Sequence, residues 1–346
     1  MAHRRLTVQR EFSLALLCGM ILLIGLSLYS SSTLSLAPHE AALLERADQP
    51  LVVQLSHIYS PLYLLLLDQW QDIGQHPLWL RLPGMLAGLL ALFMTARVMR
   101  TLTGTHAAPS GLLLLAGAPF LVAQARAISP ATLALVAALV SYVFFLEYMR
   151  VGKRRWLGGW VAATILSWGI QGGLIFLPLL QSVIVLLYRE RYSSDKQRWW
   201  WLAQALVLIV FALTFWQSFA QFLGERLTAL TPLQTAEVVP LLALLSTNLA
   251  LPEALPGMLL VLFLALSGLL ATNWRKNPRH GLLILGFLAS CPLYLFAPQS
   301  EALLLCTLPG LFGLAAMGLR LYPNWARQGL WTAVALCYVW SYWHLY

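Results

Sequence analysis

Residues 12–30 read FSLALLCGMILLIGLSLYS, a run without a single charged side chain. A transmembrane helix needs about 20 apolar residues to cross the hydrocarbon core of a bilayer, so this run predicts a membrane span. His3, Arg4, Arg5 and Arg10 precede it. A basic segment before an apolar run is typical of a signal sequence, but no small-residue cleavage site follows. We therefore expect an uncleaved signal anchor.

Ten further apolar runs follow along the chain. With 60% hydrophobic and 10% charged residues, the composition excludes a water-soluble globular protein. Lipid offers no hydrogen-bond partners to the backbone, and Leu- and Ala-rich runs of this length favour helices over the alternating strands of a barrel. The expected fold is all-α, a polytopic transmembrane bundle of about eleven spans. They are placed near residues 12–30, 79–97, 108–124, 130–148, 156–170, 172–188, 200–219, 254–272, 281–297, 302–319 and 328–345.

The charges are distributed unevenly between these runs. The net charge is +9, but the basic residues form short clusters between spans, so nucleic acid is not an expected partner. With the N-terminus in the cytoplasm, 18 of the 22 basic residues face the cytoplasm and nine of the 13 acids face outward. This predicts a multi-pass protein of the inner (cytoplasmic) membrane with its C-terminus outside. Merging the runs that meet at Gln171 would destroy the bias, so we predict two spans there.

Two predicted outer loops, 31–78 and 220–253, are much longer than the rest, and long loops often carry function. The expected organisation is a transmembrane core over 1–220 that includes the outer loop 31–78. Residues 221–346 supply the second outer loop and the C-terminal helices, without a separate soluble domain. The apolar stretch 61–67 is too short to cross and predicts an interfacial helix. The four cysteines lie in apolar runs and are expected to be buried thiols.

The first outer loop is where titratable side chains gather near the membrane. Its members are His39, Glu40, Glu45, Asp48, His57, Asp68, Asp72 and His76. A carboxylate close to lipid can have a raised pKa or bind a divalent cation, and either suits a general base. Arg81 and Arg126 also fall at the outer surface, where a guanidinium can hold a phosphate through two hydrogen bonds. The simpler interpretation is a solvated loop with ordinary surface charges.

In order along the chain, four short motifs resemble the GT-C superfamily of polyprenyl-phosphate-sugar-dependent glycosyltransferases. The resemblance covers about the first 190 residues and is to the protein O-mannosyltransferase and aminoarabinose transferase branch. Residues 37–44, with His39-Glu40, resemble the family's Asp-Glu pair, and residues 59–63 resemble its His-Pro-Pro-Leu-Tyr element. Arg81-Leu82-Pro83 resembles the Arg-Leu-Pro entry to the second span, and Gln124-Ala125-Arg126 resembles the Ala-Arg-rich turn before the fourth.

The resemblance implies transfer of a sugar from a polyprenyl-phosphate donor to a lipid, glycan or protein acceptor on the outer face. It implies catalysis by Glu40 and His39, with Glu40 as the base or as a ligand of Mg or Mn. The residues that it implies for substrate binding are Arg126, Gln124, Tyr59, Tyr63, Arg81 and His57.

The chain also departs from the family pattern. His39 replaces the first acid of the pair, and Tyr59 and Ser60 replace the His and first Pro of the next element. No stretch of the sequence is expected to form the family's usual soluble outer domain. A neutral histidine can still act as a base near pH 7. The alternative is a catalytically degenerate GT-C-like scaffold, or a lipid-binding subunit of a membrane complex. A secondary transporter would be expected to show paired broken helices and charges in mid-span, whereas the sequence shows no paired broken helices and almost no charge in mid-span.

Overall fold

The computed structural model describes residues 2–28, 36–50, 60–228, 255–272, 277–284 and 301–345, and every regular element in these ranges is helical. Besides a short helix over 278–284, the elements are α1 (Ala2–Leu28), α2 (Pro38–Ala47), α4 (Pro61–Gln71), α5 (Pro77–Leu102), α6 (Ala108–Ala116), α7 (Pro119–Arg126), α8 (Ala131–Val151), α9 (Arg154–Ile170), η1 (Gly172–Ile175), α10 (Phe176–Leu187), η2 (Arg189–Arg191), α11 (Ser194–Thr228), α13 (Leu255–Ala271), α15 (Glu301–Leu319) and α16 (Asn324–Leu345).

Helices stand at ten of the eleven predicted spans, and the remaining one, 281–297, is described only as far as residue 284. Among the described residues, Arg10–Leu28, Pro77–Leu102 and Ala131–Val151 are each long and apolar enough to cross a bilayer. The bent pair α6 and α7 would make a fourth such span. The all-α fold is therefore confirmed for the described residues, whereas the count of eleven crossings stays a prediction.

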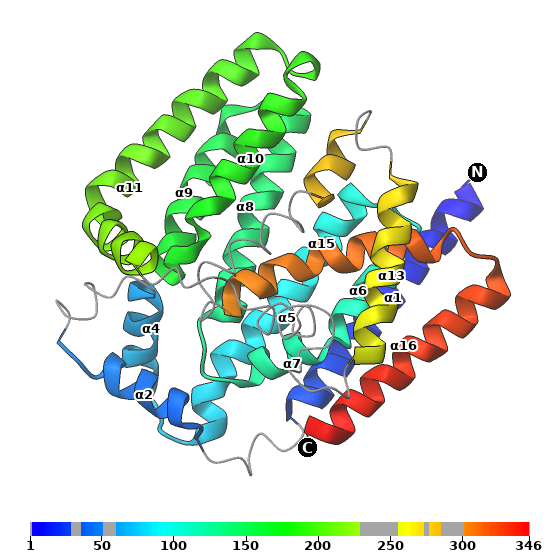
Figure 1. The fold of residues 1–346 in the computed structure, drawn as a ribbon, viewed down its shortest axis with the longest axis horizontal. Helices are drawn as coiled ribbons and strands as arrows, with labels where there is room; N and C mark the ends of the chain where they lie inside the picture. The colour runs from blue at the N-terminus through cyan, green and yellow to red at the C-terminus, as the bar shows by residue number, and fades with distance from the viewer. Residues whose placement is uncertain are drawn as a thin grey trace.

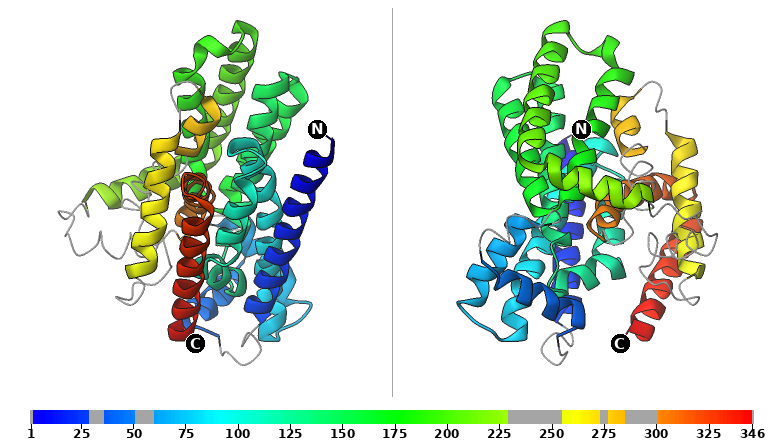
Figure 2. Two further views of the ribbon diagram at one scale, coloured as in Figure 1. Left: turned by 90° about the vertical axis from the view of Figure 1, so that its right-hand side faces the viewer. Right: turned by 60° about the vertical axis from the view of Figure 1, so that its left-hand side comes forward.

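The helices form a bundle with a small cap at one end (Figure 1). Helices α8, α9, α10 and α11 lie together on one side, and α1, α13 and α16 lie on the other. Between them, α5, α6 and α15 supply much of the large apolar core, which contains Leu92, Leu112 and Phe312. The cap consists of α2 and α4, which lie at the opposite end of the molecule from the turns that join α8 to α9 and α10 to α11 (Figure 2).

The fifth and sixth predicted spans are separate helices, as expected. Gln171 has extended backbone angles between α9 and η1, which interrupts the helical hydrogen-bond pattern. Trp160 in α9 and Gln181 in α10 lie on opposite sides of this break, and the Trp160 indole N–H donates to Gln181 Oε1 at 2.6 Å. The chain therefore reverses direction at Gln171 and forms a helical hairpin.

The third predicted span is broken, which the sequence analysis did not predict. Helices α6 and α7 meet at an angle of 53° beside Pro119, which has no backbone N–H to continue the helix. Two carbonyl groups near the break accept hydrogen bonds from the C-terminal helix instead. The Tyr338 hydroxyl donates to the Leu114 carbonyl at 3.0 Å, and Tyr342 donates to the Gly117 carbonyl at 3.1 Å.

Candidate functional site

The site is built around the Glu40 carboxylate in the first turn of α2. Pro38 starts this helix, as proline's fixed φ suits the first helical position. Glu40 lies two residues further on, and its Oε2 accepts a hydrogen bond from the Ala37 N–H at 2.9 Å. A glutamate at this position satisfies a backbone donor that the helix leaves unpaired and interacts favourably with the positive end of the helix dipole.

Arg81 in α5 is the ion-pair partner of Glu40. Its Nη2 lies 2.8 Å from Glu40 Oε2, and its Nε donates to Oε1 at 3.4 Å. Both residues are buried, with 2% of Glu40 and 4% of Arg81 exposed. Removing one partner of a buried ion pair costs about 3–5 kcal/mol, because the other charge is left without compensation. The pair therefore fixes α2 to α5.

A third donor comes from the loop between α7 and α8. The Ile128 N–H donates to Glu40 Oε1 at 2.9 Å. The loop is held in shape by Ser129, whose hydroxyl donates to Gln124 Oε1 at 2.9 Å and accepts from the Ala131 N–H at 3.1 Å. Glu40 thus joins three stretches that are far apart in sequence: α2, α5 and the loop that follows Arg126.

Two glycines of α5 let this loop approach. A Cβ on Gly84 would lie 2.9 Å from the Ala125 carbonyl oxygen and 3.1 Å from that of Ala127. A Cβ on Gly88, one turn further along, would lie 3.0 Å from the Ala125 Cβ. Small residues four apart allow helix backbones to pack closely in membranes. The Gly84–Gly88 surface therefore places the C-terminal end of α7 beside Arg81.

The electrostatics of Glu40 favour the charged form. Burial by itself would raise the pKa of the carboxyl group, but the hydrogen bonds from Arg81, Ala37 and Ile128 and the Arg81 charge outweigh it and hold the pKa below its ordinary value of 4.5. Both carboxylate oxygens accept hydrogen bonds and the group is shielded from solvent. A carboxylate of this kind is a weak base at neutral pH.

The other predicted site residues occupy different environments. His39 is exposed on α2 next to Glu40, and Arg126 is partly buried at the last residue of α7. Gln124 is buried in the loop network, and Tyr63 of α4 is buried in a small apolar core that joins the cap to α5, with Ala47, Leu80 and Ile128. His57 and Tyr59 lie outside the described residues.

The predicted divalent cation has no evident ligand set in the described part of the chain, where no three His, Cys, Asp or Glu side chains group together. Glu40 itself does not fit this role, since its oxygens are already committed to Arg81, Ala37 and Ile128. A cation would have to displace these donors.

Sequence reasoning missed the backbone donor at Ile128 and the Gln124–Ser129 hydrogen bond. Neither has a local sequence signal, because a backbone N–H is present at nearly every residue. The spacing of Gly84 and Gly88 was the available indication that α5 packs closely against another segment.

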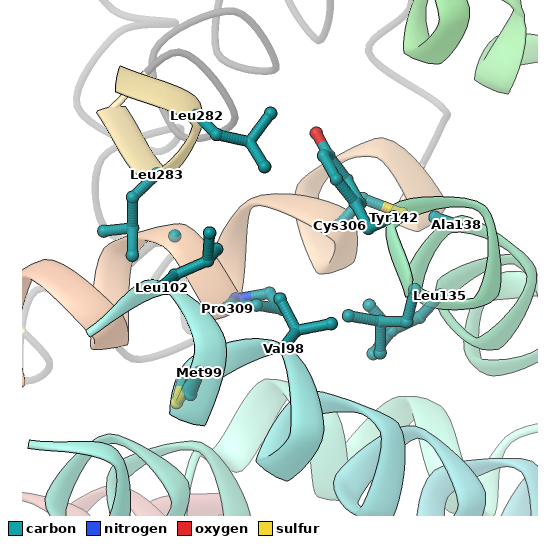
Figure 3. Close-up of a pocket in the computed structure, with 12 residues that line it drawn as sticks. Val98, Met99, Leu102, Leu135, Ala138, Tyr142, Leu282, Leu283, Cys306 and Pro309 are labelled. Atoms are coloured by element: carbon teal, nitrogen blue, oxygen red, sulfur yellow. The ribbon is translucent and has the colours of Figure 1, made fainter. Parts of the chain in front are cut away.

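A pocket lies elsewhere, between α5, α8, the helix 278–284 and α15 (Figure 3). It is lined mainly by apolar side chains, among them Val98, Leu135 and Leu283, together with Tyr142 and Cys306. Val98 is 17 residues beyond Arg81 in α5, about 25 Å along the helix axis. The pocket is therefore separate from the Glu40 site and offers it no catalytic group.

The fold resembles that of solved membrane transferases. ArnT from Cupriavidus metallidurans, solved with bound undecaprenyl phosphate, aligns with 90% of this chain and 61% of its own length, at a TM-score of 0.61 and 14% identity. The oligosaccharyltransferase AglB from Archaeoglobus fulgidus was solved with an inhibitory peptide and dolichol phosphate. It aligns with 95% of this chain and 55% of its own length, at a TM-score of 0.62 and 11% identity. Another AglB structure contains Zn and sulfate. No protein-family model and no curated protein sequence matches the chain.

These alignments show the class of fold: a helical fold that this chain shares with ArnT and AglB. The resemblance expected from the four motifs is thereby confirmed at the level of the fold. The chain spans about three fifths of ArnT and just over half of AglB.

Proposed function

We propose that this chain is a membrane glycosyltransferase that moves a sugar from a polyprenyl-phosphate carrier to a lipid, glycan or protein acceptor on the outer face of the membrane. The observation that carries the proposal is the junction at Glu40. Three of the stretches that resemble GT-C motifs, around Glu40, Arg81 and Arg126, meet at one carboxylate. The fold shared with two proteins solved with polyprenyl or dolichol phosphates supports the same function.

In this proposal Glu40 is a positioning residue rather than the base. Its oxygens have no free direction for a proton, and its pKa is low. By joining α2 to the loop after α7, it keeps His39 and Arg126 at the same end of the bundle. Glu40 as the base or as a cation ligand stays a prediction that this geometry does not favour.

His39 is the group proposed to accept the proton. It is exposed and directly follows Pro38 in α2, and its imidazole has no hydrogen bond to another described residue. A neutral imidazole can take the proton of an acceptor hydroxyl near pH 7. The hydroxyl oxygen then attacks the anomeric carbon with inversion. The bond from that carbon to the carrier phosphate breaks, and its electron pair leaves with the phosphate. Arg126 is proposed to hold this phosphate through charge-assisted hydrogen bonds.

The test uses the full chain in nanodiscs with undecaprenyl-phosphate-linked mannose or aminoarabinose and a mixed lipid and peptide acceptor extract. Mass spectrometry follows the undecaprenyl phosphate released. His39→Ala should lower turnover by about 10²- to 10⁴-fold, the usual contribution of a general base, while carrier binding is unchanged. His106→Ala is the matched control, since His106 is also exposed but lies in the turn before α6. Full turnover by His39→Ala would remove His39 from the mechanism.

The second candidate is a scaffold or complex subunit that binds the carrier without turning it over. It is favoured by the histidine at the position of the family's first acid and by the closed state of Glu40. It predicts that the wild-type chain binds undecaprenyl phosphate, releases no sugar from either donor, and co-purifies with other membrane proteins. That combination of results would reject the enzyme.

A further inference from the structure

The end of the bundle opposite Glu40 carries a dense cluster of exposed cations. We call this cluster the basic end. It consists of six exposed residues: Lys153, Arg154, Arg155, Arg189, Arg191 and Arg198. Two exposed acids, Glu190 and Asp195, lie in the same segments. None of the six cations forms an ion pair with an acid in the part of the chain that the structure describes; the nearby pairs of Glu147 use Arg97 and Arg150 instead.

Hydrogen bonds combine two distant segments into this one surface. The Tyr148 hydroxyl donates to the Lys196 carbonyl at 2.8 Å, and the Lys196 ammonium donates to the Met149 carbonyl at 3.1 Å. These bonds join the last turn of α8 to the first turn of α11. Gly152 ends α8 with a left-handed backbone, φ 76°, in the turn that leads to α9, and it packs against Lys196. The cations of the two segments are therefore held side by side.

Aromatic side chains mark the depth of this surface. The Arg154 guanidinium lies 3.9 Å from the centre of the Trp199 ring, and Arg155 lies 5.3 Å from that of Trp156. Tryptophan is enriched at the boundary between headgroups and hydrocarbon. Along the same helices, exposed apolar residues continue toward the other end, including Leu186, Leu202 and Ile209. Within about two helical turns, the exposed side chains therefore change from cationic to apolar.

The distance to the Glu40 site matches one bilayer. Helix α8 begins three residues after Ile128, which contacts Glu40, and ends at the basic end. Its 21 residues span about 30 Å, the thickness of the hydrocarbon core. When the cap lies at one membrane surface, the basic end lies among the headgroups of the other.

We propose that the basic end binds the anionic headgroups of phospholipids in the leaflet opposite the Glu40 site. The charge, the absence of acid partners for the cations, the tryptophans and the adjoining apolar band all fit a lipid headgroup layer better than an acidic protein. The proposal does not depend on the transferase activity.

The experiment compares the wild-type full chain with R155Q/R189Q/R191Q/R198Q and with R155K/R189K/R191K/R198K. No side-chain hydrogen bond of these four arginines to another described residue is found, so the substitutions change charge more than packing. Native mass spectrometry in detergent measures binding of phosphatidylglycerol and of phosphatidylcholine with identical acyl chains. A cation near an anionic lipid surface contributes about fivefold in affinity.

The wild type should prefer phosphatidylglycerol by at least about tenfold, with the preference falling as salt rises. The Gln variant should lose it and the Lys variant should keep it. An equal preference in the wild type and the Gln variant would place the lipid elsewhere. A wild type without lipid preference that retains an acidic protein from a membrane extract, lost in the Gln variant, would identify a protein as the occupant and overturn the proposal.

Discussion

At the scale of single residues, the charge state of Glu40 depends on hydrogen-bond donors from three separate segments of the chain. Its sequence context, an acid in a long outer loop, correctly indicated a position of interest, and the resemblance selected Arg81 and the turn at Arg126 alongside it. That Arg81 neutralises Glu40 depends on how α2 packs, 41 residues away in sequence. No local pattern encodes such a contact. The sequence therefore indicates Glu40 and Arg81 as residues of interest but does not predict that they form an ion pair.

A double-mutant cycle on Glu40 and Arg81 should show strong coupling. Glu40→Gln and Arg81→Met each leave a buried group without its partner and should each cost about 3–5 kcal/mol. The double variant should cost clearly less than the sum, because neither charge remains unpaired. The free energy of unfolding in mixed micelles at pH 7 is measured for the wild type and the three variants. If the losses of stability simply add, Glu40 and Arg81 do not interact directly.

The same set of proteins tests the pH dependence. The pKa of Glu40 is lowered by folding from its ordinary 4.5, so its stabilising contribution is complete above that value and is lost as pH falls through the lower folded value. The stability difference between wild type and the double variant should therefore be constant from pH 7 to about 5 and shrink below 4.5. A difference that shrinks between pH 7 and 6 would mean that folding raises the pKa instead.

At the scale of elements, the close contact of α5 with the end of α7 positions the Ile128 loop. The substitution Gly84→Ala places a methyl group against two backbone carbonyl oxygens, which cannot move as a flexible side chain can. It should cost about 1–3 kcal/mol, typical of overpacking, and should weaken carrier binding by shifting Arg126. Unfolding and undecaprenyl phosphate binding are the measurements.

Gly158→Ala is the control for this change. Gly158 also lies within a helix, but a Cβ there meets nothing within 4 Å. Alanine has the higher helix propensity, so this variant should be neutral or up to about 1 kcal/mol more stable. Equal effects of the two substitutions would show that α5 and α7 do not pack as closely as described.

Several elements follow from sequence for clear physical reasons, and others do not. The apolar runs predicted where helices stand because each run is long enough to form one, and the charge bias predicted that two spans meet at Gln171, where α9 ends. The break between α6 and α7 was not predicted, although Pro119 is a local signal for it. The donors that satisfy the carbonyls near the break, the hydroxyls of Tyr338 and Tyr342, lie more than 220 residues away and have no local signal.

At the scale of the whole molecule, the charge asymmetry predicts that the cap and the basic end face opposite sides of the membrane. Single cysteines test this in a chain whose four native cysteines are replaced by alanine. His39→Cys and Arg191→Cys are suitable because both positions are exposed. His39 belongs to the cap and Arg191 to the basic end, which lie at opposite ends of the bundle. In intact cells, an impermeant maleimide should label the first and should label the second only after permeabilisation. The reverse pattern would invert the orientation and place the Glu40 site in the cytoplasm, where an outer-face transfer is impossible. Labelling of both in intact cells would mean that α8 does not cross the bilayer, and would remove the lipid headgroups from the basic end.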